Sequence, residues 1–190
     1  MTNQTPNGGD VVNLIADIFE RRGAESYLGE AVTMAEHMLQ AAALAQAEGA
    51  PEALVAAALL HDIGHYTSEF GEYSREDTVD RRHDEAGAKV LEGFFPPVVT
   101  ECVRLHVAAK RYLCAVDGAY YDSLSTPSKH SLSLQGGPMS EAEIAGFRSL
   151  RFHQEAVRVR LWDDGGKASG LRTPAFDDFR PLLQRVIDQD

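Results

Sequence analysis

The sequence predicts an all-α fold, built as a single helical domain, and three observations support this prediction. Apolar residues recur with the 3.6-residue spacing of helices along most of the chain, whereas no alternating strand of useful length and no internal repeat is present. Gly and Pro residues stand where several of these segments end. The chain has 190 residues, 44% of them hydrophobic, which suits one domain with a core of its own.

The first part of the chain predicts three helices that follow a polar, frayed tail at residues 1–9. Gly23 ends the first helix, and Gly49 together with Pro51 ends the second. The third helix, PEALVAAALLHDIGH, is apolar on nearly every side as far as Leu60, so we expect it to be central and buried. The expected ranges are 10–22, about 29–48, and a third helix that begins at Pro51.

The second part of the chain begins with a charged loop, expected over residues 66–81, and then returns to helical patterns. Ser140 and Glu143 form a capping box at the start of one helix, and Gly165 stops another. The ranges expected to be helical are 82–93, 97–110, 140–150, 152–164 and 177–187, with short pieces over 116–138. We therefore expect one domain over residues 10–190.

Charge and cysteine content narrow the class of protein. The chain carries 18 Lys and Arg against 29 Asp and Glu, a formal net charge of −11, which argues against nucleic acid and anionic membranes as partners. No apolar run is long enough to span a membrane, and the start of the chain lacks the pattern of a signal peptide. Because two cysteines cannot form a disulfide framework, we expect a cytoplasmic protein.

Four of the seven histidines lie on different expected helices, beside apolar residues that face inward. They are His37, His61, His83 and His106. A lone histidine on an apolar helix is usually a hydrogen-bonded core residue, which is the alternative for each of them. Four imidazoles directed into one bundle are explained more simply by a shared metal centre. His130 and His153 have polar surroundings, and we assign them no function.

The dipeptide His61–Asp62 carries the strongest chemical signal in the chain. Asp62 directly follows an apolar helix, and an ionised carboxylate is costly to bury there unless it is paired or bound to metal. The alternative is that Asp62 is exposed at the helix end. If it binds metal, its two oxygens can bridge two cations. His65, four residues after His61, is a candidate ligand, partner of a ligand or substrate contact. A second carboxylate comes from the pair Asp163 and Asp164 at the end of an amphipathic helix. Asp164 is the natural candidate to face solvent, but the pattern alone does not choose between the two.

Two cations lie one helical turn from proposed ligands. Lys110 follows His106 by four residues, and Arg160 precedes Asp163 by three, so each shares a helical face with a ligand. The alternative for both is a solvated surface charge. Four imidazoles and two carboxylates suit iron, zinc or manganese but not calcium, and two bound cations would attract an anion despite the acidic chain.

The order of these residues resembles the HD-domain superfamily, and longer segments narrow the resemblance to the bacterial mixed-valent diiron oxygenases that break down organophosphonates, relatives of myo-inositol oxygenase. The matching segments are YLGEAVTMAEHMLQ (27–40), LLHDIGHY (59–66), HDEAGAKVLEG (83–93), HVAAKRYL (106–113), QGGPMSEAE (135–143) and LWDDGGK (161–167). Members of this family cleave the C–P bond of a 1-hydroxy-2-aminoethylphosphonate with O2. The resemblance spans nearly all of the chain after its N-terminal tail, diverges most over residues 68–82, and implies an HD-domain helical bundle.

This resemblance also implies roles for individual residues. The ligands it implies for the first iron are His37, His61, Asp62 and Asp163, and those for the second are Asp62, His83 and His106, with Asp62 as the bridge. The residues matched to positions around the phosphonate are Lys110, Ser128, Ser131, Gln135, Arg160 and His65. The family has Thr where this chain has Ser131, which keeps the hydroxyl.

Tyr27 and Glu30 complete the implied catalytic set together with His65. The resemblance implies that Tyr27 occupies an open position on the second iron and swings away with Glu30 when substrate binds. The implied cofactors are two iron ions as an Fe(II)/Fe(III) pair, with O2 as co-substrate. The implied products are phosphate and glycine, or glycine betaine for a 2-trimethylammonio substrate, and the sequence does not decide between the two.

Two other classes of function use the same residues. A two-metal HD-domain phosphohydrolase would act on a phosphate ester without O2. A non-catalytic fold whose metals are structural is the other class, and for it we expect that His83→Ala does not change the affinity for ligand. For the oxygenase we expect a small organophosphonate as the only partner class, and a monomer or small homo-oligomer.

Overall fold

The computed structural model describes residues 8–27, 29–67 and 82–189, and its regular structure in these ranges is helical apart from one isolated bridge between Ser26 and Thr33. The helices are α1 (Gly8–Arg22), α2 (Met34–Ala47), α3 (Glu52–Leu60), α4 (Gly64–Thr67), α5 (His83–Leu91), α6 (Pro97–Val116), α7 (Gly118–Ser123), α8 (Thr126–Leu134), α9 (Glu141–Ser149), α10 (His153–Gly165) and α11 (Phe176–Asp188). The prediction of an all-α fold is confirmed.

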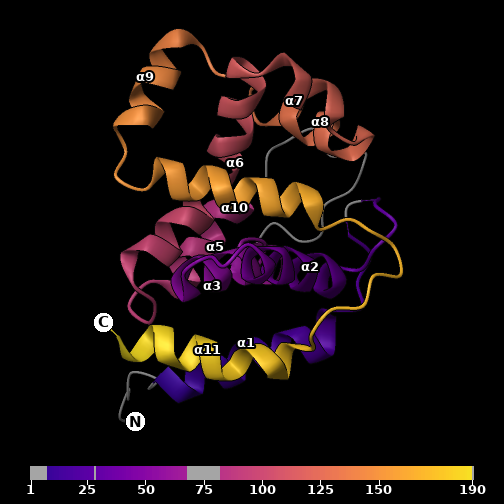
Figure 1. Ribbon diagram of the computed structural model, residues 1–190, viewed down its shortest axis with the longest axis vertical. Helices are drawn as coiled ribbons and strands as arrows, with labels where there is room; N and C mark the ends of the chain where they lie inside the picture. Colours follow the sequence, from indigo (N-terminus) through magenta and orange to yellow (C-terminus); the bar gives the residue numbers. More distant parts are fainter. Residues whose placement is uncertain (1–7, 28, 68–81, 190) are drawn as a thin grey trace.

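Figure 1 shows these helices stacked in successive layers. The first layer is formed by α1 and α11, which pack against each other, and the next by α2 and α3. Helix α10 crosses the middle of the molecule and packs against both α2 and α6. The short helices α7, α8 and α9 lie at the end opposite α1 and α11.

Helix α3 is the centre of the core, as its sequence predicts. All of its residues from Leu54 to Leu60 are buried, and it packs against α2, α6, α10 and α11. Its three consecutive alanines let the neighbouring helices approach closely, and burial of an apolar helix on all sides is the main source of stability for such a layered fold. The residues that immediately follow α3 are therefore held in the interior.

Several helix boundaries differ from the predicted ones for local reasons. Helix α2 begins at Met34 rather than near residue 29, because Thr33 and Glu36 form a capping box there. The long third helix stops at Leu60, and a turn separates it from α4. Helix α6 continues past residue 110 to Val116.

Two predicted segments lie partly outside the described residues. Helix α1 begins at Gly8, within the expected tail, and residues 1–7 are not described. Of the expected loop, residues 68–81 are also outside the described ranges. Within those ranges, no helix combines the length and the apolar character that a membrane span requires.

Candidate metal centre

The six predicted metal ligands come together from five segments of the chain, and all six are buried. Their positions are His37 in α2, His61 and Asp62 directly after α3, His83 at the start of α5, His106 in α6 and Asp163 in α10. Because α3 ends at Leu60, the turn that follows directs both His61 and Asp62 towards the same interior point, which adjacent residues within a helix could not do.

A close contact between α4 and α5 brings His83 beside this turn. A Cβ atom added to Gly64 would lie 1.8 Å from the carbonyl oxygen of His83, so only glycine permits this approach of the two backbones. Gly64 of the HDIG segment therefore allows the backbone of His83 to lie next to the turn that carries Asp62.

The first pair of imidazoles belongs to His37 and His61, whose Nε2 atoms lie 3.0 Å apart. The Nε2 atom of His37 is 3.5 Å from Oδ2 of Asp62 and 3.4 Å from Oδ1 of Asp163. The Nε2 atom of His61 is 3.3 Å from Oδ2 of Asp62. Two ligands that bind one ion at about 2.1 Å and at right angles lie about 3 Å apart, which matches this spacing.

The second pair belongs to His83 and His106, whose Nε2 atoms are also 3.0 Å apart. They lie 3.3 Å and 3.5 Å from Oδ1 of Asp62. The two pairs therefore face different oxygens of the same carboxylate, Oδ2 for the first pair and Oδ1 for the second. This is the arrangement required of a carboxylate that bridges two cations.

The remaining polar atoms of the site fit metal ligation better than a network of hydrogen bonds alone. Oδ2 of Asp62 and Oδ1 of Asp163 are buried and have no hydrogen-bond partner, which is costly for a carboxylate unless a cation binds it. Backbone carbonyls of Gly166, Ala58 and Val103 lie 2.7–2.9 Å from the Nδ1 atoms of three of the histidines. An Nδ1–H donated to each carbonyl leaves the Nε2 lone pair free for a metal.

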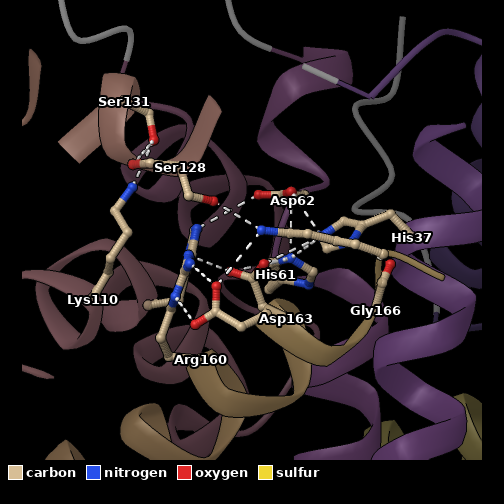
Figure 2. A network of polar contacts seen from close by, with 12 residues as sticks. His37, His61, Asp62, Lys110, Ser128, Ser131, Arg160, Asp163 and Gly166 are labelled. Carbon is tan, nitrogen blue, oxygen red and sulfur yellow. Dashed lines mark hydrogen bonds and ion pairs between the residues drawn. The ribbon is translucent and has the colours of Figure 1, made fainter. Parts of the chain in front are cut away.

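The charges around the site keep both carboxylates ionised. Burial alone would raise the pKa of Asp62, but the neighbouring imidazoles, His61 first, hold it well below its usual range. The pKa of Asp163 is also lowered despite its burial, chiefly by Arg160, which donates a 2.6 Å hydrogen bond from Nη1 to Oδ2 (Figure 2). Two anionic oxygen ligands are thus available at neutral pH.

A cavity extends from this centre towards α8, and the other predicted site residues line it. Its lining includes Tyr27, Glu30, His65, Lys110, Ser128, Ser131, Gln135 and Arg160. Of the proposed ligands, Asp62, His83, His106 and Asp163 line it, whereas His37 and His61 do not. The structure therefore brings every predicted site residue to one place, with a cationic and hydroxyl-bearing wall that faces the proposed metal ligands.

Within this wall, Lys110 donates a 2.8 Å hydrogen bond to Ser131, as Figure 2 shows. Burial, with a smaller effect of Arg160, lowers the pKa of Lys110 to about 7. The side-chain oxygen of Gln135 is buried without a hydrogen-bond partner, so it is free to accept a donor from a bound molecule.

Tyr27 and His65 each stack on a proposed ligand. The Tyr27 ring lies over His37 with centroids 3.8 Å apart, and burial followed by the charge of Asp62 raises the pKa of its phenol well above the ordinary value. His65 stacks on His83 at 4.1 Å, and its Nε2 lies 3.7 Å from Oδ1 of Asp62. Burial lowers the pKa of His65 to about 3, which keeps this imidazole neutral.

Asp164, the other carboxylate at the end of α10, is 21% exposed but is also engaged by neighbouring side chains. Its carboxylate accepts a 3.0 Å hydrogen bond from Nε of Arg160 and a 2.5 Å hydrogen bond from the hydroxyl of Tyr120. Arg160 is therefore held by both Asp163 and Asp164, and its orientation is fixed by α7 as well as by α10. Neither the Tyr120 contact nor its consequence has a signal in the sequence.

The sequence also did not point to Lys167 and Ser125. Lys167 lines the cavity and donates a 2.9 Å hydrogen bond to Ser128, while Ser125 donates a 2.5 Å hydrogen bond to Oε1 of Glu30. A signal for Lys167 existed in its place four residues after Asp163, in the segment LWDDGGK. None existed for Ser125, which lies 95 residues from Glu30 in sequence.

Comparisons with known proteins agree with this geometry. The HD domain matches residues 34–142, a range that contains the proposed ligands other than Asp163. The chain is 55% identical, over 96% of its length and 93% of the relative, to the glycine-betaine-forming 1-hydroxy-2-(trimethylamino)ethylphosphonate dioxygenase of Leisingera caerulea. It is 41% identical, over 98% of its length and 92% of the relative, to a hydroxymethylphosphonate dioxygenase of Gimesia maris. An uncharacterized protein of Acanthamoeba polyphaga mimivirus is 31% identical over 94% of the chain and 82% of the relative.

Proposed function

The chain belongs to the HD-domain family, and we propose that it is a dioxygenase that cleaves the C–P bond of a 1-hydroxyalkylphosphonate with a cationic 2-amino group. The 2-trimethylammonio compound is the substrate we favour, since the relative that shares 55% of residues carries that activity in its name. The observation that supports the proposal most is that the two oxygens of Asp62 face separate imidazole pairs at the floor of a cavity with a cationic wall.

The reaction balances with O2 as the only oxidant. The C1–H and C–P bonds break and supply four electrons, which reduce one molecule of O2. One oxygen atom is added to C1, which becomes the carboxylate of glycine betaine, and the other is added to phosphorus, which leaves as phosphate. One proton is released in addition.

We propose that the cofactor is a pair of iron ions in the Fe(II)/Fe(III) state. His37, His61, Asp62 and Asp163 would hold one ion, and Asp62, His83 and His106 the other; this donor set of nitrogens and oxygens suits iron. When bound, the pair supplies the Lewis acidity that orients the substrate oxygens and the redox capacity that O2 requires.

The protein side chains then have binding and orienting tasks. Lys110 and Arg160 neutralise the phosphonate, while Ser128, Ser131 and Gln135 offer hydrogen bonds at defined positions of its oxygens. Glu30, on the same cavity, pairs with the substrate cation. A trimethylammonium group cannot donate hydrogen bonds and is recognised by aromatic faces, for which Tyr27 is present in the cavity. His65, kept neutral by burial, can accept or donate one hydrogen bond to the substrate.

Phosphate release under O2 tests this proposal. Iron-loaded protein is incubated with the 2-trimethylammonio and the 2-amino substrate, with and without O2, and phosphate is measured. We expect O2-dependent release with equimolar glycine betaine from the first compound, and a mixed-valent diiron EPR signal that changes when substrate is added. Hydrolysis of a phosphate ester by the manganese-loaded protein without O2, together with no release from either phosphonate, would instead indicate the two-metal phosphohydrolase.

A further inference from the structure

Lys167 is a third cation at the cavity, and its contacts leave it available to a ligand. Its side chain is 14% exposed and its Nζ atom donates one hydrogen bond among the described residues, to Ser128 at 2.9 Å. The carboxylates nearest to it are more distant, at 3.6 Å for Asp164 and 3.9 Å for Glu30. Because an ammonium group has three N–H donors, Lys167 retains donors that can reach into the cavity.

Lys167 and Lys110 flank the same face of α8 in matching ways. Lys110 donates to Ser131 and Lys167 donates to Ser128, and these two hydroxyls are one helical turn apart. The third cation, Arg160, differs from both, since Asp163, Asp164 and Tyr120 already engage its nitrogens. The two lysines are therefore the cations best able to change partners when an anion enters between α8 and the metal ligands.

Lys167 also lies between the anionic and the hydroxyl-bearing parts of the wall. Glu30 is fixed by the 2.5 Å hydrogen bond from Ser125, and Ser125 itself caps α8 by accepting from the backbone N–H of Ser128. Lys167 thus faces a carboxylate whose position is set by the N-terminus of α8, while its own hydrogen bond goes to the same turn of that helix.

We propose that Lys167 binds the phosphonate of the substrate and, before substrate arrives, serves as the counter-ion of Glu30. A zwitterionic substrate then exchanges partners with this pair: its cation replaces Lys167 beside Glu30, and its phosphonate takes up the ammonium of Lys167. A substrate without a cation leaves Glu30 to Lys167, which must then serve both anions. This inference rests on the proposed function, and it assigns to Lys167 a part in selecting substrates with charges at both ends.

Binding measured without turnover tests the exchange. Iron-loaded protein is titrated anaerobically by calorimetry with two probes, the 2-trimethylammonio substrate and hydroxymethylphosphonate, which lacks the cation. In Lys167→Gln the unscreened charge of Glu30 repels a phosphonate that brings no cation. Both probes lose the contact of Lys167 with the phosphonate, so we expect the Kd of the zwitterion to rise by about 10-fold. The Kd of hydroxymethylphosphonate, which Glu30 also repels, should rise by about 100-fold. When Lys167→Gln is instead introduced into the Glu30→Gln variant, the Kd values of the two probes should rise by the same factor, because the repulsion by Glu30 is then absent.

Controls separate this role from damage to the fold. Lys129→Gln removes the same charge from α8, the helix that Lys167 contacts, at a position outside the cavity lining, and should leave both Kd values unchanged. Lys167→Arg keeps the charge and should restore most of the affinity, and iron content should equal that of the wild type in every variant. If both probes bind the wild type but Lys167→Gln weakens them equally or not at all, the exchange is overturned while the proposed function stands. If neither probe binds the wild type, the proposed function itself fails.

Discussion

The two imidazole pairs of the centre differ in their burial and in the number of carboxylates close to them. His37 and His61 are fully buried, do not line the cavity, and have two carboxylates within reach, those of Asp62 and Asp163. His83 and His106 line the cavity, and among the described residues the carboxylate that they face is that of Asp62. In proteins, metal sites that are closed by protein ligands hold an ion in place, whereas catalytic sites leave positions open. We therefore propose that the first pair would anchor a bound metal centre and that the second pair would present its reactive position.

Loss of the Asp62 carboxylate should have the largest effect on activity, since both imidazole pairs face this one carboxylate. In Asp62→Ala both pockets lose a ligand, so we expect activity to fall well beyond the roughly 100-fold typical of lost supporting partners of a ligand. Iron per chain, measured after gel filtration by elemental analysis, should fall together with phosphate release. Asp122→Asn, at an exposed site on α7, removes the same type of charge and should change neither quantity.

Single histidine losses should separate the two pockets. His83→Ala leaves the second pocket with Asp62 and His106, while His37→Ala leaves the first with His61, Asp62 and Asp163. At equal free iron we therefore expect His83→Ala to retain about one ion per chain and His37→Ala close to two, bound more weakly. Substrate binding, measured anaerobically, should be lost in His83→Ala but only reduced in His37→Ala. Equal iron loss in both variants would contradict the distinction between an anchoring and an open pocket.

The open pocket should also depend on pH through its cationic wall. Burial lowers the pKa of Lys110 to about 7, so this side chain is charged below that pH and loses its proton as pH rises through it. We expect the ratio of KM in Lys110→Met to KM in the wild type to be about 10 or more at pH 6 and to approach 1 at pH 9. Ionisation of the substrate cancels in this ratio. A ratio that stays constant between pH 6 and 9 would show that Lys110 does not titrate there.

The same lowered pKa predicts a small effect on stability with a definite sign. Between pH 7 and the ordinary lysine value the unfolded chain binds a proton at this position that the folded chain does not. The contribution of Lys110 to the free energy of unfolding therefore becomes more favourable as pH rises through this window. Urea titrations should show that Lys110→Met stabilises the protein at pH 6.5 more than at pH 9.

The all-α fold and the burial of four histidines and Asp62 around one point could be predicted from the sequence because each depends on local pattern. Apolar spacing marks the helices, and an Asp directly after an apolar helix indicates a buried ligand. The contacts of Lys167, Ser125 and Tyr120 could not be predicted, because each joins segments that lie 39 or more residues apart and follows no period. The contact between Asp164 and the hydroxyl of Tyr120 in α7 could not be predicted for the same reason, since the two residues lie 44 positions apart. Residues that follow a helical period were thus easier to predict than contacts between segments far apart in the sequence.

Tyr27 touches both regions, and the smallest expected effect concerns its hydroxyl. Its ring stacks on His37 of the closed pocket, while the residue also lines the cavity of the open one. If the phenol occupies the open position until substrate displaces it, Tyr27→Phe keeps the stacked ring and removes the group that must leave. Anaerobic titration should then show the 2-trimethylammonio substrate binding about two- to threefold more tightly, a gain within the usual net worth of one hydrogen bond, with iron content unchanged. Weaker binding would mean that the hydroxyl contacts the substrate directly. In that case Tyr27 would act only in binding the substrate, and another group would occupy the open position before substrate binds.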